Sequence, residues 1–238
     1  MGRGHMAADG AFARYRRRVA SRAVHGLWGV AQRAGTITAG NPAGHPFRAF
    51  GMGSLIGFPT GALYGEKWIE IGAGTMIAAQ VSLSAGMVPG QDLGDEAVLR
   101  IGDRCVIGRG SHIVAHHSIQ IGDDVFTGPY TYITDQNHGY ADPDVPIGRQ
   151  WPSNTAVTIG AGTWLGAGVI VLPGAAIGCN VVVAAGSVVR GVVPDRCVIA
   201  GVPARVVREY VRGNGWKRPV PEPARAPAPV TPAPGDPS

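Results

Sequence analysis

The residues best suited to chemistry are the histidines between positions 112 and 138. His138 ends the run Asp135-Gln136-Asn137-His138 and directly precedes a long polar segment, residues 139–158. Imidazole titrates near neutrality, so a histidine beside a polar loop can take a proton from an attacking hydroxyl or amine. Position alone favours equally a general base and a residue that only anchors the loop.

The element that must position His138 is a repeat of six residues. Within residues 159–189 an aliphatic side chain recurs at every sixth position, and a small or β-branched residue follows four positions later. A period of six fits neither a helix nor a simple strand. It indicates a chain that runs straight, turns a corner and repeats, which is typical of a parallel β-helix. The aliphatic positions are Ile159, Leu165, Val171, Ile177, Val183 and Val189.

Earlier hexads start at Ile71, Ile101 and Ile121, with a slip of two residues before Ile121. Two loops interrupt them, at residues 89–100 and 139–158. Because interruptions of a rigid solenoid usually carry function, we expect the active residues there. The predicted domains are an N-terminal basic helix and linker (1–49), the β-helix (50–212) and a disordered Pro/Ala-rich tail (213–238).

The N-terminal segment predicts an amphipathic helix from Asp9 to about Arg33, with an apolar stripe opposite an arginine-rich face. Such a face is most often simply solvated. Docking on an anionic membrane or a charged acceptor is the alternative. No nucleic-acid partner is expected, because no recognised nucleic-acid fold or aromatic stacking motif accompanies the arginines.

Composition points to a single solenoid rich in turns, with abundant glycine and few aromatic residues. The three cysteines form no paired framework and fit a reducing compartment. Cys105 falls on an inward small-residue position and is interpreted as core filler. No apolar run reaches the length of a membrane span, so a cytoplasmic location is expected.

The motifs also carry a family resemblance. The string IGDDVFTGPYTYITDQNH, TIGAGTWLGAGVIVLPGAAIG, VVAAGSVVRGVVP and AGVPARVVREY resembles the left-handed β-helix acyltransferases with hexapeptide repeats. It is most similar to their maltose and galactoside O-acetyltransferase branch. The resemblance covers about Ile71 to Tyr210. It implies a homotrimer with active sites between subunits and transfer of acetyl from acetyl coenzyme A to a hydroxyl, usually on a sugar. The predicted fold is thus a mainly β, left-handed parallel β-helix with an N-terminal helix, a short C-terminal helix after Pro194 and a disordered tail.

The resemblance assigns roles to single residues. His138 matches the family's catalytic base, and Trp164 matches the tryptophan lining the groove for the pantetheine arm. Gly166, Ala167 and Ala185 match backbone positions that hydrogen-bond the pantetheine amides. The basic residues matching or replacing those beside the coenzyme phosphates are Arg190, Arg205 and Arg208.

The acceptor side departs from the family pattern. Where sugar-specific members hold the acceptor with an Asn or Asp and a later carboxylate, this chain has Gly110 and His116. Loop residues that could contact an acceptor are as readily structural. The candidate substrate-binding residues are His112, His116, His117, Asn137, Asp142, Arg149 and Trp151.

Two other functions stay open. His112 and His117, just before an Ile-Gly-Asp motif, resemble the zinc-binding pair of γ-class carbonic anhydrases, which share this coil. The third histidine that a carbonic anhydrase would need near residues 76–81 is missing, which weighs against this alternative. For the acyltransferase interpretation no metal is predicted. A non-catalytic trimeric β-helix scaffold is the second alternative.

Overall fold

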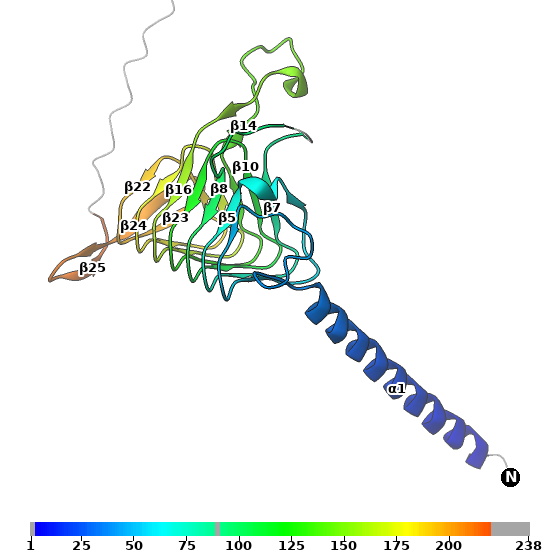
Figure 1. The fold of residues 1–238 in the computed structure, drawn as a ribbon. Coiled ribbons are helices and arrows are strands. Elements are labelled where there is room, and N and C mark those ends of the chain that lie inside the picture. The colour runs from blue at the N-terminus through cyan, green and yellow to red at the C-terminus, as the bar shows by residue number, and fades with distance from the viewer. Residues whose placement is uncertain (1–2, 89–90, 220–238) are drawn as a thin grey trace, which may run out of the picture.

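The chain winds into a three-sided prism of parallel strands (Figure 1). The structure is a computed structural model that describes residues 3–88 and 91–219. Each turn of the coil passes through three sheets in the same order, here called faces B, A and C. Parallel strands must be joined by crossovers, and here the corners of the coil serve that purpose.

The strands of each face are short. Face B holds β2 (Ala49–Phe50), β5 (Ile69–Ile71), β8 (Leu99–Ile101), β11 (Ile119–Ile121), β16 (Val157–Ile159), β19 (Ala176–Ile177) and β22 (Val192–Val193). Face C holds β4 (Leu63–Tyr64), β7 (Ser82–Ala85), β10 (His112–Ala115), β13 (Tyr132–Thr134), β18 (Ile170–Val171) and β21 (Val188–Val189). Face A holds β1 (Ile37–Thr38), β3 (Leu55–Ile56), β6 (Met76–Ile77), β9 (Val106–Ile107), β12 (Phe126–Thr127), β17 (Trp164–Leu165), β20 (Val182–Val183), β23 (Cys197–Gly201), β24 (Ala204–Val211) and β25 (Gly215–Lys217).

The core consists of the predicted hexad residues stacked along the prism. Ile77, Ile107, Leu165 and Val183 are buried on face A, and equivalent aliphatics fill faces B and C. Stacking equivalent side chains removes apolar surface from water at every coil, which is the main stabilising contribution. Cys105 is fully buried, as its inward position predicts.

Two corners of the prism matter for the site. The AC corner, where the chain leaves face A for face C, includes residues 166–168 and 184–186. The CB corner, where it leaves face C for face B, includes residues 116–118 and 172–174. The chain between β7 and β8 also leaves the prism at the CB corner, as does that between β13 and β16. Both interruptions of the coil, and the two-residue slip at 116–118, are therefore stacked along one edge.

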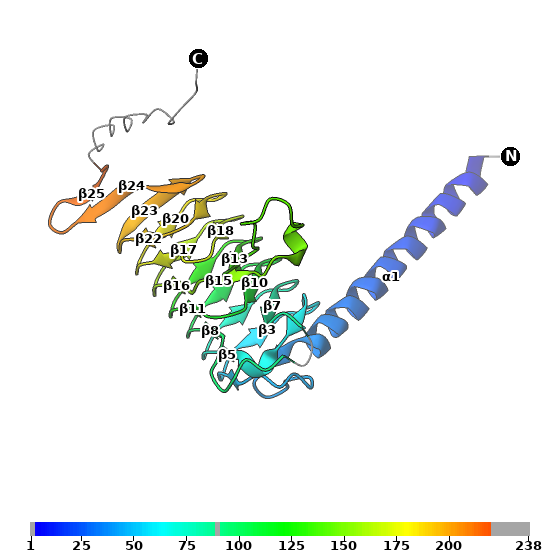
Figure 2. The ribbon, with the colours of Figure 1, turned by 90° about the horizontal axis from the view of Figure 1, so that it is seen from above.

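The N-terminal helix α1 (Arg3–Gly35) is longer than the predicted segment and projects away from the prism (Figures 1 and 2). Its last turns meet the first coil, where Trp28 packs on Phe58 at 6.2 Å between ring centroids. A Cβ at Gly35 would collide with the Phe58 ring, so glycine is needed for this approach. Among the described residues, no helix is long and apolar enough to cross a membrane.

The predicted short C-terminal helix is wrong. After Pro194 the chain forms β23, reverses, and adds β24 and β25 as antiparallel strands at the end of face A. The last coil leaves an edge of unpaired backbone groups, and the β-branched Val206, Val207 and Val211 suit a strand that pairs with it. Gly201, at a φ of 105°, begins the reversal. β25 also lies within the tail predicted from residue 213, while residues 220–238 of that prediction lie outside the described part of the chain.

Candidate active site

The CB corner is organised by Asp135, a fully buried acid that the sequence did not single out. One carboxylate oxygen accepts the backbone N–H of His116 at 2.8 Å. The other accepts the N–H groups of His117 and Ser118 at 2.8 and 2.7 Å. The Asp135 carbonyl accepts the N–H of Thr155 at 2.7 Å, where the second loop returns. Asp135 thus fixes the two-residue slip on one coil and closes the loop of the next. Hydrogen bonds to an ionised acceptor are stronger than neutral ones.

His116 lies on this fixed corner, with its Nδ1 atom buried and without a hydrogen-bond partner among the described residues. Burial lowers the pKa of His116 below its ordinary value. The carboxylate of Asp135 opposes that shift, and the nearby His138 adds to it. The ring is therefore neutral at pH 7, with one nitrogen carrying a proton and the other able to accept a hydrogen bond. The structure brings two predicted site residues, His116 and His138, within electrostatic reach of each other.

His138 stands at the end of a two-stranded stalk formed by β14 (Gln136–Asn137) and β15 (Ser153–Asn154). The side chain of His138 is exposed, as is that of Asn137, which pairs with Ser153 across the stalk. Antiparallel pairing holds both ends of the loop, so His138 is placed by regular backbone hydrogen bonds rather than by a free loop.

The loop beyond His138 is braced by its own residues. Gln150 donates from Nε2 to the carbonyls of Asp142 and Val145, both at 2.8 Å. The Asp142 carboxylate accepts the N–H of Asp144 at 2.9 Å, so a structural role accounts for this predicted acceptor residue. Arg149 lies in a short 3-10 helix (Ile147–Arg149) and is exposed. Trp151, 90% exposed, has its ring free in solvent and remains open to a partner.

The two loops touch each other across the corner. Gln136 Nε2 lies 3.3 Å from Met87 Sδ and 3.1 Å from Asn154 Oδ1. Met87 in turn donates its N–H to Gln91 Oε1 at 2.8 Å. The segment after β7 therefore lies against the base of the stalk that carries His138.

At the AC corner the predicted coenzyme residues are arranged by backbone geometry. Gly166 is buried, and its N–H donates to the Val183 carbonyl at 2.8 Å. A Cβ there would lie 2.6 Å from the Ala185 nitrogen, so glycine is required for coil stacking rather than for exposure to a ligand. Within residues 91–219 no backbone acceptor receives the N–H groups of Ala167 and Ala185. Of the three predicted coenzyme-binding positions, Ala167 and Ala185 therefore keep backbone N–H groups available to a ligand, one coil apart.

Trp164 lies on the outer surface of face A, directly before this corner, and is 48% exposed. Its register partners are Phe126 and Val182 on neighbouring coils. The outer surface of face A is therefore apolar beside Ala167 and Ala185.

The three predicted phosphate-binding arginines are not gathered in one place. Arg205 and Arg208 lie on β24, opposite Ala200 and Val198 of β23, at the end of face A. Arg190 lies at the CB corner, after β21. Arg205 and Arg208 thus lie in the same sheet as Trp164, whereas Arg190 lies at the same corner of the prism as His138.

Within one chain, the two corners are separated by face C. Ala167 and the CB corner residue Leu172 stand at opposite ends of β18, about 16 Å apart for an extended chain. His138 and the backbone donors of the AC corner therefore do not form one pocket within a single subunit.

A separate hollow lies along face B, away from both corners. It measures about 580 Å³ and is lined by Glu70, Arg100 and Gln120 among others. Glu70 accepts hydrogen bonds from Arg48 and Arg100, both at 2.9 Å, so these polar side chains pair with one another along the stack. No predicted site residue lies in it.

The metal alternative gains no support from the geometry. His112 lies on the outer surface of face C between Ser82 and Tyr132, while His117 lies at the CB corner. Across the part of the chain that the structure describes, no group of three or more His, Cys, Asp or Glu side chains is arranged to hold a metal ion.

Two known protein families match segments of the β-helix. A model described as "Bacterial transferase hexapeptide (six repeats)" matches residues 156–191, and one described as "Hexapeptide repeat of succinyl-transferase" matches residues 98–127. Both matches fall within the stacked hexads of the prism. The left-handed parallel β-helix predicted from the resemblance is confirmed.

Relatives of this hexapeptide-repeat chain carry acetyltransferase names. WbbJ of Escherichia coli (strain K12), a putative lipopolysaccharide biosynthesis O-acetyl transferase, is 43% identical over 106 residues, or 42% of this chain and 54% of that protein. The probable acetyltransferase Rv3034c of Mycobacterium tuberculosis is 35% identical over 151 residues, covering 63% and 45%. A galactoside O-acetyltransferase of Lactococcus lactis subsp. lactis is 40% identical over 97 residues, covering 41% and 46%. The chain spans about half the length of these relatives.

Among solved structures, AntD, an N-acyltransferase from Bacillus cereus in complex with dTDP and 3-hydroxybutyryl-CoA, superposes with a TM-score of 0.59. The match covers 70% of this chain and 85% of AntD at 22% sequence identity. At this identity, the likeness establishes the shared fold.

Proposed function

We propose that the protein transfers an acetyl group from acetyl coenzyme A to a hydroxyl of a sugar or glycoconjugate. The observation that carries this proposal is the fixed CB corner, where Asp135 holds His116 beside His138. The acetyltransferase names of WbbJ and of the galactoside relatives support the reaction and favour oxygen as the acceptor atom. Acetyl coenzyme A is a metabolite of the cell interior, so we also propose a cytoplasmic location.

The reaction needs one base and no covalent acyl-enzyme. His138 removes the proton of the acceptor hydroxyl as its oxygen attacks the thioester carbonyl carbon. The carbon–sulfur bond then breaks, and the imidazolium returns its proton to the departing thiolate. Backbone N–H groups at a coil corner are suited to stabilise the negative oxygen of the tetrahedral intermediate.

The donor is assigned to the AC corner and the outer surface of face A. The pantetheine arm would lie against Trp164, with its amides on the available N–H groups of Ala167 and Ala185. Arg205 and Arg208 would bind the nucleotide phosphates, because the guanidinium fork matches phosphate oxygens. Arg190 lies on the other corner and would reach the same coenzyme only from a neighbouring subunit.

The separation of the corners supports a homotrimer. His138 of one subunit and Ala167 of the next would face each other across a subunit boundary, which no single chain achieves. The acceptor would enter beside His138, next to the neutral ring of His116. His112, His117, Asn137, Arg149 and Trp151 line the approach, and Asp142 holds the loop in shape.

The test follows free thiol release from acetyl coenzyme A with a panel of sugar acceptors. His138→Ala should lower kcat by about 10²- to 10⁴-fold, the usual worth of a positioned base, and leave coenzyme affinity unchanged. His25→Asn, an exposed histidine of α1, is the matched control and should retain full turnover.

Unchanged turnover in His138→Ala would remove the base assignment. If the wild-type protein neither releases thiol nor binds the coenzyme, a scaffold role replaces the enzyme. Zinc in stoichiometric amount without thiol release would instead support the carbonic anhydrase alternative.

A further inference from the structure

Helix α1 carries two adjacent stripes of different chemistry. Tyr15, Val19, Ala23 and Leu27 recur every fourth residue, and with Val30 they fall within about 120° of the helix circumference. Arg14, Arg18 and Arg22 follow the same spacing one residue earlier and flank that stripe. A hollow among Arg14, Arg17, Arg18, Ser21 and Arg22 shows that these side chains gather on one side.

From residue 13 onward, the charged side chains of this helix have a single sign. Residues 13–35 contain six arginines and neither Asp nor Glu. Opposite charges placed four residues apart would neutralise one another along a solvated helix. Over residues 13–35 no acidic side chain is present at such a spacing, so this stretch of the helix favours an anionic partner.

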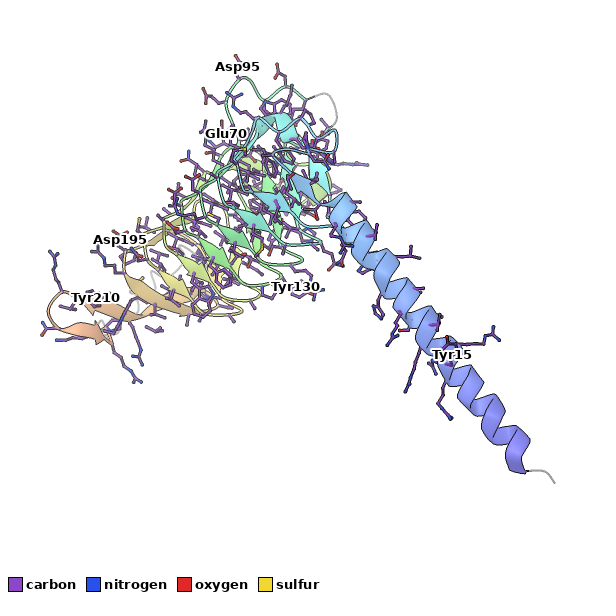
Figure 3. All side chains as sticks on the ribbon, turned by 60° about the horizontal axis from the view of Figure 1, so that its bottom comes forward. Tyr15, Glu70, Asp95, Tyr130, Asp195 and Tyr210 are labelled. Atoms are coloured by element: carbon purple, nitrogen blue, oxygen red, sulfur yellow. The ribbon has the colours of Figure 1, made fainter. Side chains whose placement is uncertain are left out.

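The apolar stripe is uncovered. Tyr15 is 65% exposed, Leu27 is 71% exposed and Val30 is 55% exposed. Figure 3 shows Tyr15 on the part of α1 that extends well away from the side chains of the prism. Trp28 belongs to a different side, where it anchors the helix on Phe58. The prism thus holds one end of α1 and leaves its apolar stripe available.

We propose that α1 docks the protein on the surface of an anionic lipid bilayer, independently of the acetyl transfer proposed above. An apolar stripe flanked by arginines is the arrangement of helices that lie in the interface plane. Their apolar side enters the boundary between headgroups and acyl chains. The arginine stems lie along that boundary, and their charged heads reach the lipid phosphates. Charge decides in favour of lipid over a second copy of α1, which over residues 13–35 would bring its own arginines and no carboxylates.

The experiment measures binding of the full-length protein to phosphatidylcholine vesicles with and without phosphatidylglycerol. The wild-type protein should bind only the anionic vesicles, and added salt should weaken binding. Each arginine near an anionic surface contributes about fivefold in affinity, so Arg14→Gln/Arg18→Gln/Arg22→Gln should weaken binding about a hundredfold. Glutamine keeps helix propensity close to that of arginine, so α1 stays helical.

The matched control removes the same charge at the other end of the prism. Arg212→Gln/Lys217→Gln/Arg218→Gln changes exposed residues in and beside the C-terminal hairpin and should leave vesicle binding within about twofold of wild type. A second variant, Val19→Gln/Leu27→Gln/Val30→Gln, keeps every charge and should weaken binding about tenfold or more.

Equal binding to both vesicle types would overturn the proposal. So would an equal loss of vesicle affinity in the α1 arginine variant and in the C-terminal control variant. It would also fail if the apolar variant kept its vesicle affinity and lowered the oligomeric mass, because a second copy would then cover the stripe. None of these readings involves acetyl transfer, so the docking proposal and the proposed activity can fail separately.

Discussion

The AC and CB corners are made by the same coils, yet they offer different chemistry. At the AC corner the hexads run without interruption, and small residues place the backbone of Ala167 and Ala185 one coil apart. At the CB corner the coil is interrupted by two loops and a two-residue slip, and side chains dominate through Asp135, His116 and His138. A regular corner suits an extended ligand bound through its amides, whereas an interrupted corner suits proton transfer.

The two corners also differ in what holds them. The AC corner depends on close packing, since Gly166 has no room for a Cβ beside Ala185. The CB corner depends on one buried carboxylate that accepts three backbone N–H groups. We therefore expect removal of the two supports to have different effects on the free energy of unfolding and on coenzyme affinity.

Removing the carboxylate should give the largest loss of stability. Asp135→Ala leaves the N–H groups of residues 116–118 without their acceptor, and we expect a loss of about 4 kcal/mol in the free energy of unfolding. The measurement is urea denaturation, with turnover assayed in parallel.

The matched control is Asp195→Ala, an exposed carboxylate that accepts a single N–H, from Cys179 at 2.8 Å. It should cost about 1 kcal/mol. Equal losses in the two variants would show that burial and the number of hydrogen bonds at Asp135 do not matter.

Crowding the AC corner should have a smaller effect on stability and a specific one on the coenzyme. In Gly166→Ala the new Cβ would meet the backbone of Ala185, so the coils must shift, at a cost of about 2 kcal/mol. The Kd of coenzyme A should rise, because Ala167 and Ala185 change their spacing. Equilibrium binding and urea denaturation measure both.

Gly26→Ala is the control for that change. A Cβ at Gly26 meets no atom within 4 Å, and alanine is the better helix former by about 0.5–1 kcal/mol. Stability should stay the same or rise, with coenzyme affinity unchanged. A Gly166→Ala variant that behaves like Gly26→Ala would contradict the packing account of the corner.

The smallest expected effect is a pH dependence at His116. Its pKa is lower in the folded protein than its ordinary value of 6.5, mainly through burial. The unfolded state therefore binds more protons in this range, so stability falls as pH drops through 6.5 and keeps falling until the folded pKa is passed. His116→Asn should flatten this part of the curve of melting temperature against pH. An unchanged slope would contradict a buried neutral His116.

The regular AC corner was predictable from the sequence, whereas the support of the CB corner was not. Hexads such as Ile159, Leu165 and Val171 predict the coil because each aliphatic repeats one local environment. The loops were recognisable as interruptions of that period, and His138 as a residue at their edge. Asp135 was missed because an acid beside Gln136 and Asn137 has the composition of a solvated loop. Its burial depends on backbone N–H groups from the preceding coil.

The C-terminal error has a similar origin. The sequence PARVVREYV after the last coil contains residues compatible with a helix, but the open edge of β23 decided in favour of β24. Tertiary pairing overrode local preference there. Only the structure shows that the N–H of Gly166 donates to the carbonyl of Val183.

The most direct test of the central claim, that the two corners meet only between subunits, is complementation. His138→Ala removes the base at one corner, and Ala185→Trp blocks the groove at the other; each variant alone should be inactive. In randomly mixed trimers about three quarters contain both variants, and one of their three boundaries pairs an intact His138 with an open groove. About a quarter of wild-type turnover should be recovered after co-refolding. No recovery, with mixed trimers demonstrated by mass spectrometry, would contradict the claim.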